Sequence, residues 1–332
     1  MAELPKSYLG AQVIESGKPL QINEIQIPEL QQGEVLIRVE AAPIDQLDLV
    51  SAGAENYLNK QVPFVLGAEG SGIIVAKHES VQNLEIGQKA SFLTLSKFGA
   101  YGQYSVANIS FVLPLPENLS FEQGASAIGN PVTVMLMLEE AKEQKAKAVI
   151  NTAAASALGR QFVRYFQSNG IEVINIIRRK EQENTLKQDG AKYILNSSDP
   201  NFLKDLEQLI TELKVTLFFD AIGGEITGKI FKLLPSGSIT YIYGMLSGTN
   251  FEIDGKEILT RGKIIKNFSL LSTKHPFNPF SHQEALSRLH ELLQSQLQTH
   301  YHKQYSLNQI NEALEDQKQN GSIGKVLIRP NK

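Results

Sequence analysis

The chain has 332 residues, 42% of them hydrophobic and 20% charged, with 32 Lys and Arg against 35 Asp and Glu. This length predicts more than one domain, and the balanced charge argues against a nucleic-acid partner. No apolar run approaches the ~20 residues that cross a bilayer, so we expect no membrane insertion. The chain contains no cysteine, which excludes disulfides, thiolate metal ligands and cysteine nucleophiles. Because the first residues also lack a secretion or organelle signal, we expect a cytoplasmic protein.

Residues 1–120 show short β patterns. The segment Glu34–Glu40 alternates, with Val35, Ile37 and Val39 on one face, and further strands are predicted over Gln21–Ile27, Gly70–Ala76 and Lys89–Leu95. Gly and Pro residues separate these runs with turns. Short strands broken in this way predict a compact β-barrel domain rather than an open parallel sheet.

The pattern changes over residues 121–270, where strands alternate with helices. A helix is predicted over Phe121–Glu143, with Pro131 at a helix start or kink. Alternating strands and helices at this spacing predict βαβ units and an α/β fold, a Rossmann-type doubly wound parallel sheet. The predicted strands are Ala148–Asn151, Glu172–Ile177, Lys192–Leu195, Val215–Asp220, Ser238–Tyr243 and Ile264–Ser272, and the helices between them are Leu158–Ser168, Gln182–Asp189, Phe202–Leu213 and Gly228–Leu234.

Residues 271–332 are predicted to return to the first domain and complete it. They contain two amphipathic helices, over Gln283–Ser295 and Leu307–Gln319, and a terminal strand over Gly324–Ile328.

A strand feeds a helix through small residues at Val149–Gly159. The sequence G-x-G-x-x-G of many dinucleotide sites is missing, and only Gly159 remains of it. Small residues still let the backbone approach a pyrophosphate at the helix N-terminus. We therefore predict a nucleotide-binding turn, and a tightly packed strand–helix turn is the alternative.

The second predicted strand of this domain runs into Arg178-Arg179-Lys180. Sites specific for NAD usually place an acidic residue at this point, about 20 residues after the turn, to hold the ribose 2′-OH. Cations here would instead pair with a 2′-phosphate, which favours NADPH over NADH as the cofactor. A solvated basic loop is the alternative.

Several motifs, taken in order, resemble one family. They are Ala41–Asp48, Asn56-Tyr57, Pro63–Gly72 (PFVLGAEGSG), Gly129–Thr133, Ile150–Gly159, Ile174–Arg178, Asp220–Gly224 and Tyr243–Met245. Together they resemble the medium-chain dehydrogenase/reductase superfamily, and within it the zinc-free branch of quinone oxidoreductases and trans-2-enoyl thioester reductases. The resemblance implies a GroES-like catalytic domain beside the Rossmann domain.

Zinc-dependent members of the superfamily carry Gly-His-Glu where this chain has Gly67-Ala68-Glu69, and they use cysteine ligands that this chain lacks. We therefore predict no metal site and exclude a zinc alcohol dehydrogenase. Reduction of a quinone or of an activated C=C bond stays feasible without a metal, because the acceptor itself delocalises the incoming charge.

The resemblance also implies roles for individual residues. Tyr57 falls where enoyl thioester reductases have the tyrosine that protonates the substrate carbon, with a packed aromatic as the alternative. Asp45, the second candidate catalytic residue, falls where quinone oxidoreductases have Asn, and its carboxylate is expected either to shape the acceptor pocket or to disfavour acidic substrates. The implied cofactor-binding residues are Asn130, Thr133, Ser156, Ala157, Leu158, Arg178, Arg179, Tyr243, Gly244, Met245, Phe268, Leu270 and Lys325.

We therefore expect an NADPH-dependent oxidoreductase that transfers hydride to a small electrophilic acceptor: a quinone, an enone or an enoyl thioester. The resemblance further implies a homodimer that pairs sheets edge to edge around Phe268–Ser272. The alternative is a catalytically inactive relative that acts as a structural or NADPH-sensing subunit, and it is motivated by the loss of glycine from the turn at Ala153–Gly159.

Overall fold

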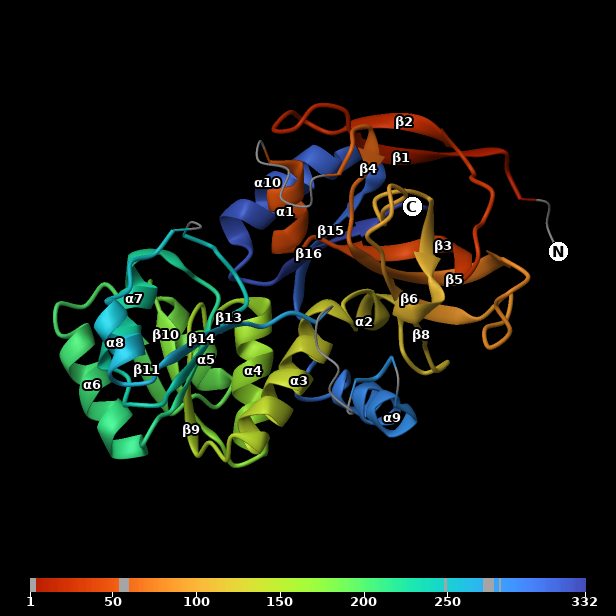
Figure 1. Cartoon of the computed structure of the whole chain (residues 1–332). Coiled ribbons are helices and arrows are strands. Elements are labelled where there is room, and N and C mark those ends of the chain that lie inside the picture. The colour runs from red at the N-terminus through yellow and green to blue at the C-terminus, as the bar shows by residue number, and fades with distance from the viewer. Residues whose placement is uncertain (1–3, 54–59, 248–249, 271–277, 281) are drawn as a thin grey trace. The chain divides into compact units, whose positions relative to one another are not determined.

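The computed structural model describes residues 4–53, 60–247, 250–270, 278–280 and 282–332. The chain forms two compact units (Figure 1). Unit 1 comprises Met1–Pro131 together with Asn278–Lys332, and unit 2 comprises Val132–Phe277. The chain therefore leaves unit 1, builds unit 2 and then returns to unit 1.

Unit 1 is built on β-sheets. The larger sheet has the order β15-β16-β3-β5-β6-β8, and β7 also pairs with β3. The smaller sheet has the order β2-β1-β4. Most pairs are antiparallel, as short strands joined by tight turns require. The strands are β1 (Ser7–Val13), β2 (Gln21–Gln26), β3 (Glu34–Pro43), β4 (Phe64–Val65), β5 (Glu69–Lys77), β6 (Lys89–Leu93), β7 (Tyr104–Asn108), β8 (Val112–Pro114), β15 (Tyr301–Ser306) and β16 (Lys325–Arg329).

The core of unit 1 joins both of its chain segments. Val35, Ile37 and Val39, predicted to share a buried face of β3, are fully buried, and the same core contains Val326 and Ile328 of β16. β16 pairs antiparallel with β3 and parallel with β15. The helices of this unit are α1 (Gln46–Ala52), α2 (Phe121–Ala125), α9 (Gln283–Leu292) and α10 (Ile310–Asn320), and α3 (Gly129–Glu143) begins here and continues into unit 2.

Unit 2 has a parallel sheet in the order β11-β10-β9-β12-β13-β14. Counted along the unit, this is the Rossmann order 3-2-1-4-5-6, so the predicted doubly wound sheet is confirmed. The order reverses between β9 and β12, and ligands of such sheets bind at the carboxyl ends of the strands at that point. The strands are β9 (Ala148–Asn151), β10 (Glu172–Ile177), β11 (Tyr193–Asn196), β12 (Leu217–Asp220), β13 (Ile239–Ile242) and β14 (Ile264–Asn267).

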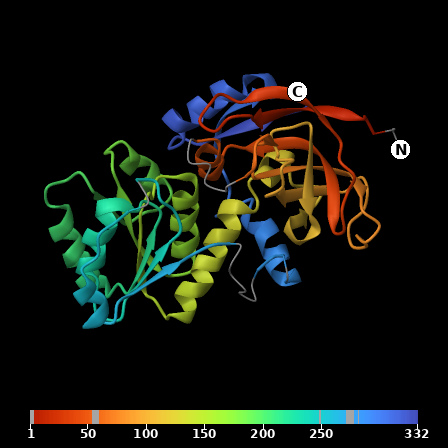
Figure 2. The ribbon, with the colours of Figure 1, turned by 45° about the horizontal axis from the view of Figure 1, so that its top comes forward.

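Helices cover both faces of this sheet (Figures 1 and 2). Neighbouring residues of a strand point to opposite faces, and β12 shows the consequence. Phe218 packs in one core with residues of α6 and α7, whereas Phe219 meets the rings of Phe162 and Phe166 on α4. The helices of the unit are α4 (Ala157–Ser168), α5 (Gln182–Gln188), α6 (Phe202–Leu213), α7 (Gly224–Leu233) and α8 (Gly255–Leu259).

The predicted helix Phe121–Glu143 is two helices in the structure. α2 ends at Ala125 and α3 begins at Gly129. Pro131 explains the break, because it has no N–H to donate to the carbonyl of Ala127 and its ring would clash with that carbonyl. Within the first turn of a new helix the same proline is tolerated. The structure also ends the predicted strand Ile264–Ser272 at Asn267.

Candidate active site

The turn between β9 and α4 lies at the carboxyl edge of the sheet in unit 2. The N–H of Ala154 donates to the carbonyl of Ile176 at the end of β10 (3.2 Å), so the turn reaches over the neighbouring strand. The Oγ of Ser156 accepts from the N–H of Gly159 (3.1 Å) and caps α4. Ala157 and Leu158 follow in the first turn of the helix, where backbone N–H groups have no acceptor within the helix.

Two residues of the turn have backbone features that glycines have in the missing motif. Ala153 adopts a left-handed φ of 49°, which an alanine tolerates at a cost of ~1–2 kcal/mol. A Cβ on Gly159 would lie 2.5 Å from the carbonyl oxygen of Ala154, so only glycine fits there. Tight turning and close helix–strand packing are two of the three roles that glycines have in dinucleotide sites. The geometry of such a turn is therefore kept without its usual sequence.

Substitution at these two positions should affect stability to different extents. Gly159→Ala forces backbone apart and should lower the free energy of unfolding by about 1–3 kcal/mol, although alanine normally favours a helix. Ala153→Gly should change it by less than about 1 kcal/mol, because relief of the left-handed φ offsets the added freedom of the unfolded chain. Denaturant unfolding of the two variants measures both effects. A Gly159→Ala protein as stable as the parent would contradict the close packing of the turn.

The predicted 2′-phosphate residues directly follow β10. Arg178 and Arg179 are exposed, and their backbone N–H groups both donate to Oε1 of Gln182 (3.3 and 3.1 Å). Ser198 Oγ donates to the carbonyl of Arg178 (3.0 Å). Since β10 lies beside β9, this anchored basic loop shares the carboxyl edge with the Ala153–Gly159 turn. The structure therefore brings the two predicted parts of a nucleotide site to one edge of one sheet.

Asp220, at the end of β12, anchors the third part of this edge. Its fully buried carboxylate accepts hydrogen bonds from Thr152 (2.6 Å) and Thr227 (2.5 Å) and from the N–H groups of Ile222 and Gly223 (3.0 and 3.1 Å). The carboxylate therefore fixes the loop into α7 and connects it to the end of β9. The motif Asp220–Gly224 predicted no role for Asp220 itself, because its four partners are known only from the fold.

Tyr243, Gly244 and Met245 follow β13. The hydroxyl of Tyr243 lies 3.5 Å from Oδ1 of Asn151, and burial, with the charge of Asp220, raises the pKa of the phenol. Met245 is exposed. These residues therefore lie at the same strand ends as the nucleotide turn. The half-buried Phe268 packs its ring edge-on against Phe219 and Tyr241, at centroid distances of 6.2 and 5.8 Å, and Leu270 is half-buried.

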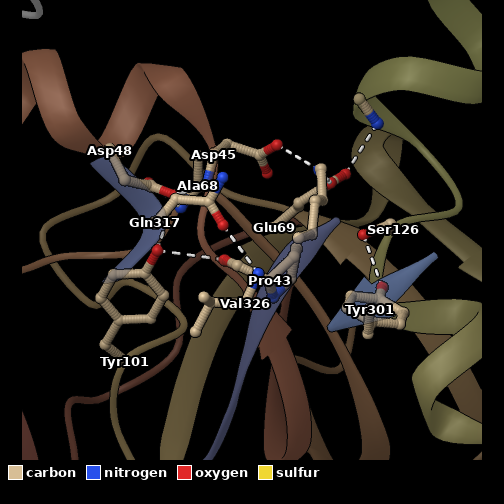
Figure 3. Close-up of polar contacts among 12 residues, drawn as sticks. Pro43, Asp45, Asp48, Ala68, Glu69, Tyr101, Ser126, Tyr301, Gln317 and Val326 are labelled. Carbon is tan, nitrogen blue, oxygen red and sulfur yellow. Dashed lines mark hydrogen bonds and ion pairs between the residues drawn. The ribbon is translucent and has the colours of Figure 1, made fainter. Parts of the chain in front are cut away.

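Unit 1 contains a buried cluster of charges, shown in Figure 3. The ammonium of Lys325, at the start of β16, contacts the carboxylate of Asp45 and lies 3.4 Å from Oε1 of Glu69. The side chains of Lys325 and Glu69 are 4% and 2% exposed, whereas that of Asp45 is 18% exposed. Burial lowers the pKa of Lys325, but the two carboxylates outweigh this effect and raise it. Burial and the charge of Asp45 raise the pKa of Glu69.

A second buried carboxylate supports the loop that carries Asp45. Asp48 accepts from the N–H groups of Asp45 and Ala68 (both 2.9 Å) and from the hydroxyl of Tyr101 (2.7 Å). Burial and the charge of Asp45 raise the pKa of Asp48 to about 7, against the pull of these three hydrogen bonds. The sequence did not predict that Glu69, Asp48 and Tyr101 belong to one network. The available signal was a carboxylate that interrupts an apolar run, as Glu69 does in PFVLGAEGSG.

The remaining predicted residues are placed as follows. Asn130 and Thr133 are half-buried in the first turns of α3. Tyr57 lies outside the described residues.

Among the residues that the structure describes, no group of three or more His, Asp and Glu side chains is arranged to hold a metal ion. In the same part of the chain, no helix combines the length and apolar character needed to cross a bilayer.

Two protein-family models and several known proteins are similar to this chain. The family model of the alcohol dehydrogenase GroES-like domain matches residues 31–117, and the model of the zinc-binding dehydrogenase matches residues 189–328. The quinone oxidoreductase of Sus scrofa is 26% identical over 258 residues, which cover 77% of this chain and 77% of that protein.

Solved structures with the same fold superpose on nearly the whole chain. A Mesorhizobium loti protein, suggested to be an NADPH:quinone reductase, superposes with a TM-score of 0.88 at 26% identity and covers 99% of this chain and 100% of its own. A mycobacterial protein solved with NADPH shares the fold, with a TM-score of 0.80 at 22% identity over 98% of this chain and 100% of its own.

A GroES-like unit of β-sheets joined to a Rossmann unit, with these relatives, defines the class of protein as an oxidoreductase. The chain belongs to the medium-chain dehydrogenase/reductase superfamily, in its quinone oxidoreductase branch. The family predicted from the motifs is therefore confirmed.

Proposed function

We propose that the protein is an NADPH-dependent reductase that transfers hydride to a quinone or to the activated C=C bond of an enone or enoyl thioester. The observation that carries the proposal is the juxtaposition of the Ala153–Gly159 turn with Arg178 and Arg179 at one edge of the parallel sheet. The names of the Sus scrofa and Mesorhizobium loti relatives support the reductase class.

The described residues fit a dinucleotide. The left-handed Ala153 and the Cβ-free Gly159 form a turn that a pyrophosphate can approach closely, and the N-terminus of α4 favours its negative charge. Arg178 and Arg179 supply the cations that a 2′-phosphate requires. When bound, NADPH supplies the hydride; the protein contributes binding, orientation and exclusion of water.

Other residues act on the acceptor side in this proposal. Asp45 presents the exposed part of the buried cluster and shapes the acceptor pocket. Tyr57 serves as the general acid when the acceptor is an alkene. Asn130 and Thr133 orient the nicotinamide from α3, as the resemblance to other reductases implies. Tyr243 to Met245, which follow β13, border the nicotinamide, as the same resemblance implies.

A thermal-shift experiment, followed by an activity screen, tests the proposal. NADPH should raise the melting temperature more than NADH at equal concentration, since the ligand that binds the folded state more tightly stabilises it more. NADPH oxidation should then be measured with 1,2- and 1,4-quinones, alkenals and enoyl-CoA esters. Equal or absent shifts would refute the NADPH assignment. Preferential binding of NADPH without turnover of any acceptor would favour the alternative of an inactive, NADPH-sensing relative.

Tyr57→Phe separates the two acceptor classes. The variant should reduce alkenes about 10²–10⁴-fold more slowly, because a positioned general acid contributes that much. Quinone reduction should change little, since a reduced quinone takes its protons from water. Steady-state rates with one quinone and one enone measure the split, and Tyr193→Phe serves as a matched control. Alkene kinetics equal to those of the parent would remove Tyr57 from the mechanism.

We also propose a homodimer through the edge strand β14. This strand pairs only with β13 among the described strands, and Ile264 on it is 42% exposed. Ile258 and Leu259 of α8, the helix that precedes it, are 48% and 86% exposed. Exposed apolar residues near an unpaired edge are typical of an interface. Sedimentation of the parent and of Ile264→Lys tests whether this edge holds two copies together.

A further inference from the structure

The first turn of α3 is held by a residue that is distant in the sequence. The N–H of Gly129, the first residue of the helix, donates to Oε2 of Glu69 over 2.7 Å. The first N–H groups of a helix have no acceptor within the helix, so an outside acceptor fixes where the helix begins. Glu69 starts β5 and its side chain is 2% exposed, which gives this acceptor a rigid support.

Gly129 itself is fitted to this contact. A Cβ at this position would lie 3.0 Å from Oε2 of Glu69 and 3.4 Å from Oε1, closer than a side chain packs comfortably against a carboxyl group. The carboxyl group of Glu69 therefore lies against the bare backbone of the helix. A small displacement of Glu69 moves the first turn of α3, and Asn130 is the next residue in that turn.

Lys325 determines where the carboxyl group of Glu69 lies. Its ammonium lies 3.4 Å from Oε1 of Glu69, which leaves Oε2 for Gly129, and it also contacts Asp45. The N–H of Lys325 donates to the carbonyl of His300 (2.9 Å), so its backbone is fixed within the sheet. The cluster thus connects the starts of four elements: α1, β5, α3 and β16.

We infer that Glu69 is a positioning residue, held by Lys325, that sets the first turn of α3 and through it the contact of Asn130 with the nicotinamide. This inference rests on the proposed function, which places the nicotinamide at that turn. Hydride transfer requires close alignment of donor and acceptor, and a displacement of about 1 Å can slow a reaction by roughly 100-fold. The carboxyl group of Glu69 itself need not touch the cofactor or the acceptor.

The test compares Glu69→Leu with Glu69→Gln in the full-length protein. The leucine variant removes the acceptor for Gly129, whereas the amide oxygen of glutamine preserves it. Glu69→Leu should slow single-turnover hydride transfer from NADPH to a quinone by at least about 10-fold, and Glu69→Gln should restore most of the rate. Affinity for 2′,5′-ADP, which reports the Arg178 end of the site, should stay at the parent value in both variants.

Two results would overturn the inference. One is hydride transfer at the parent rate in a folded Glu69→Leu protein; the other is a Glu69→Gln protein as slow as the leucine variant. If Glu69→Leu does not fold, Gly129→Ala tests the same contact, because it keeps the charges and crowds Glu69 by a single methyl group. A parent-like rate in Gly129→Ala would then refute the inference. Failure of the proposed function is distinguishable, since the parent protein itself would then not oxidise NADPH with any acceptor, whether or not it binds 2′,5′-ADP.

Discussion

Replacing Arg178 and Arg179 together with alanine is expected to abolish most of the preference for NADPH over NADH. Both side chains are exposed at the end of β10, beside the turn that would receive the pyrophosphate. Hydrogen bonds to a charged group contribute about 1.5–3 kcal/mol each when shielded and less on a surface. We expect the ratio of kcat/KM for the two cofactors to fall by roughly 30- to 100-fold, on the order of 2–3 kcal/mol.

The loss should fall on NADPH alone, because NADH has no 2′-phosphate for the arginines to contact. Lys142→Ala/Lys147→Ala is the matched control, since both lysines are exposed and lie near the amino end of β9, the opposite edge of the sheet. This control should leave the ratio unchanged. An unchanged ratio in the arginine variant would instead show that Arg178 and Arg179 belong to a solvated surface loop.

Lys325→Met is expected to be the most destabilising single substitution considered. It leaves the carboxyl groups of Asp45 and Glu69 in the interior of unit 1 without their cation. Removing one partner of a buried ion pair costs about 3–5 kcal/mol, or roughly 6–20 °C in melting temperature for a unit of this size. Lys187→Met is a suitable control, because the side chain of Lys187 is 60% exposed in its pair with Glu183 and such pairs contribute less than about 1 kcal/mol.

The effect of Lys325→Met should depend on pH. The pKa of Glu69 is already raised by burial and by Asp45, and losing the ammonium raises it further. Above pH ~4, Glu69 is ionised in the unfolded variant but still protonated in the folded one. The free energy of unfolding should therefore fall as the pH rises from ~4 through the raised pKa of Glu69 in the folded state. Melting temperatures at pH 5 and pH 8 measure this slope. A destabilisation equal at both values would show that Lys325 contributes packing rather than charge.

The sheet of unit 2 was predictable because its strands are short apolar runs at regular spacing. Glu172–Ile177 and Ala148–Asn151 were predicted with the bounds that the structure gives, since both strands are almost entirely buried apolar runs, and Asn169-Gly170 ends the helix before the first of them. The strand β1 was not predicted. Its residues, Ser7–Val13, mix polar and apolar types, and their pairing with β2 and β4 is decided by contacts far along the chain.

The nucleotide edge of the candidate site was predictable in part. The apolar pattern located the end of the strand Glu172–Ile177, which Arg178 directly follows. The position of Arg178 relative to the Ala153–Gly159 turn could therefore be derived. The left-handed φ of Ala153 could not be derived, because alanine rarely adopts it and nothing local requires it. The cluster of Asp45, Glu69 and Lys325 was also out of reach, since its members are separated by up to 280 residues and meet only because β16 and β5 both pair with β3.

The placement of β16 between β15 and β3 has a consequence for synthesis on the ribosome. The segment of unit 2, Val132–Phe277, is contiguous and is complete before the strand that closes unit 1 is made. At about 5–20 residues per second, the Rossmann sheet has several seconds to form before β16 is synthesised and can pair with β3. Nascent chains should therefore acquire affinity for the adenosine end of the cofactor before they acquire any reductase activity.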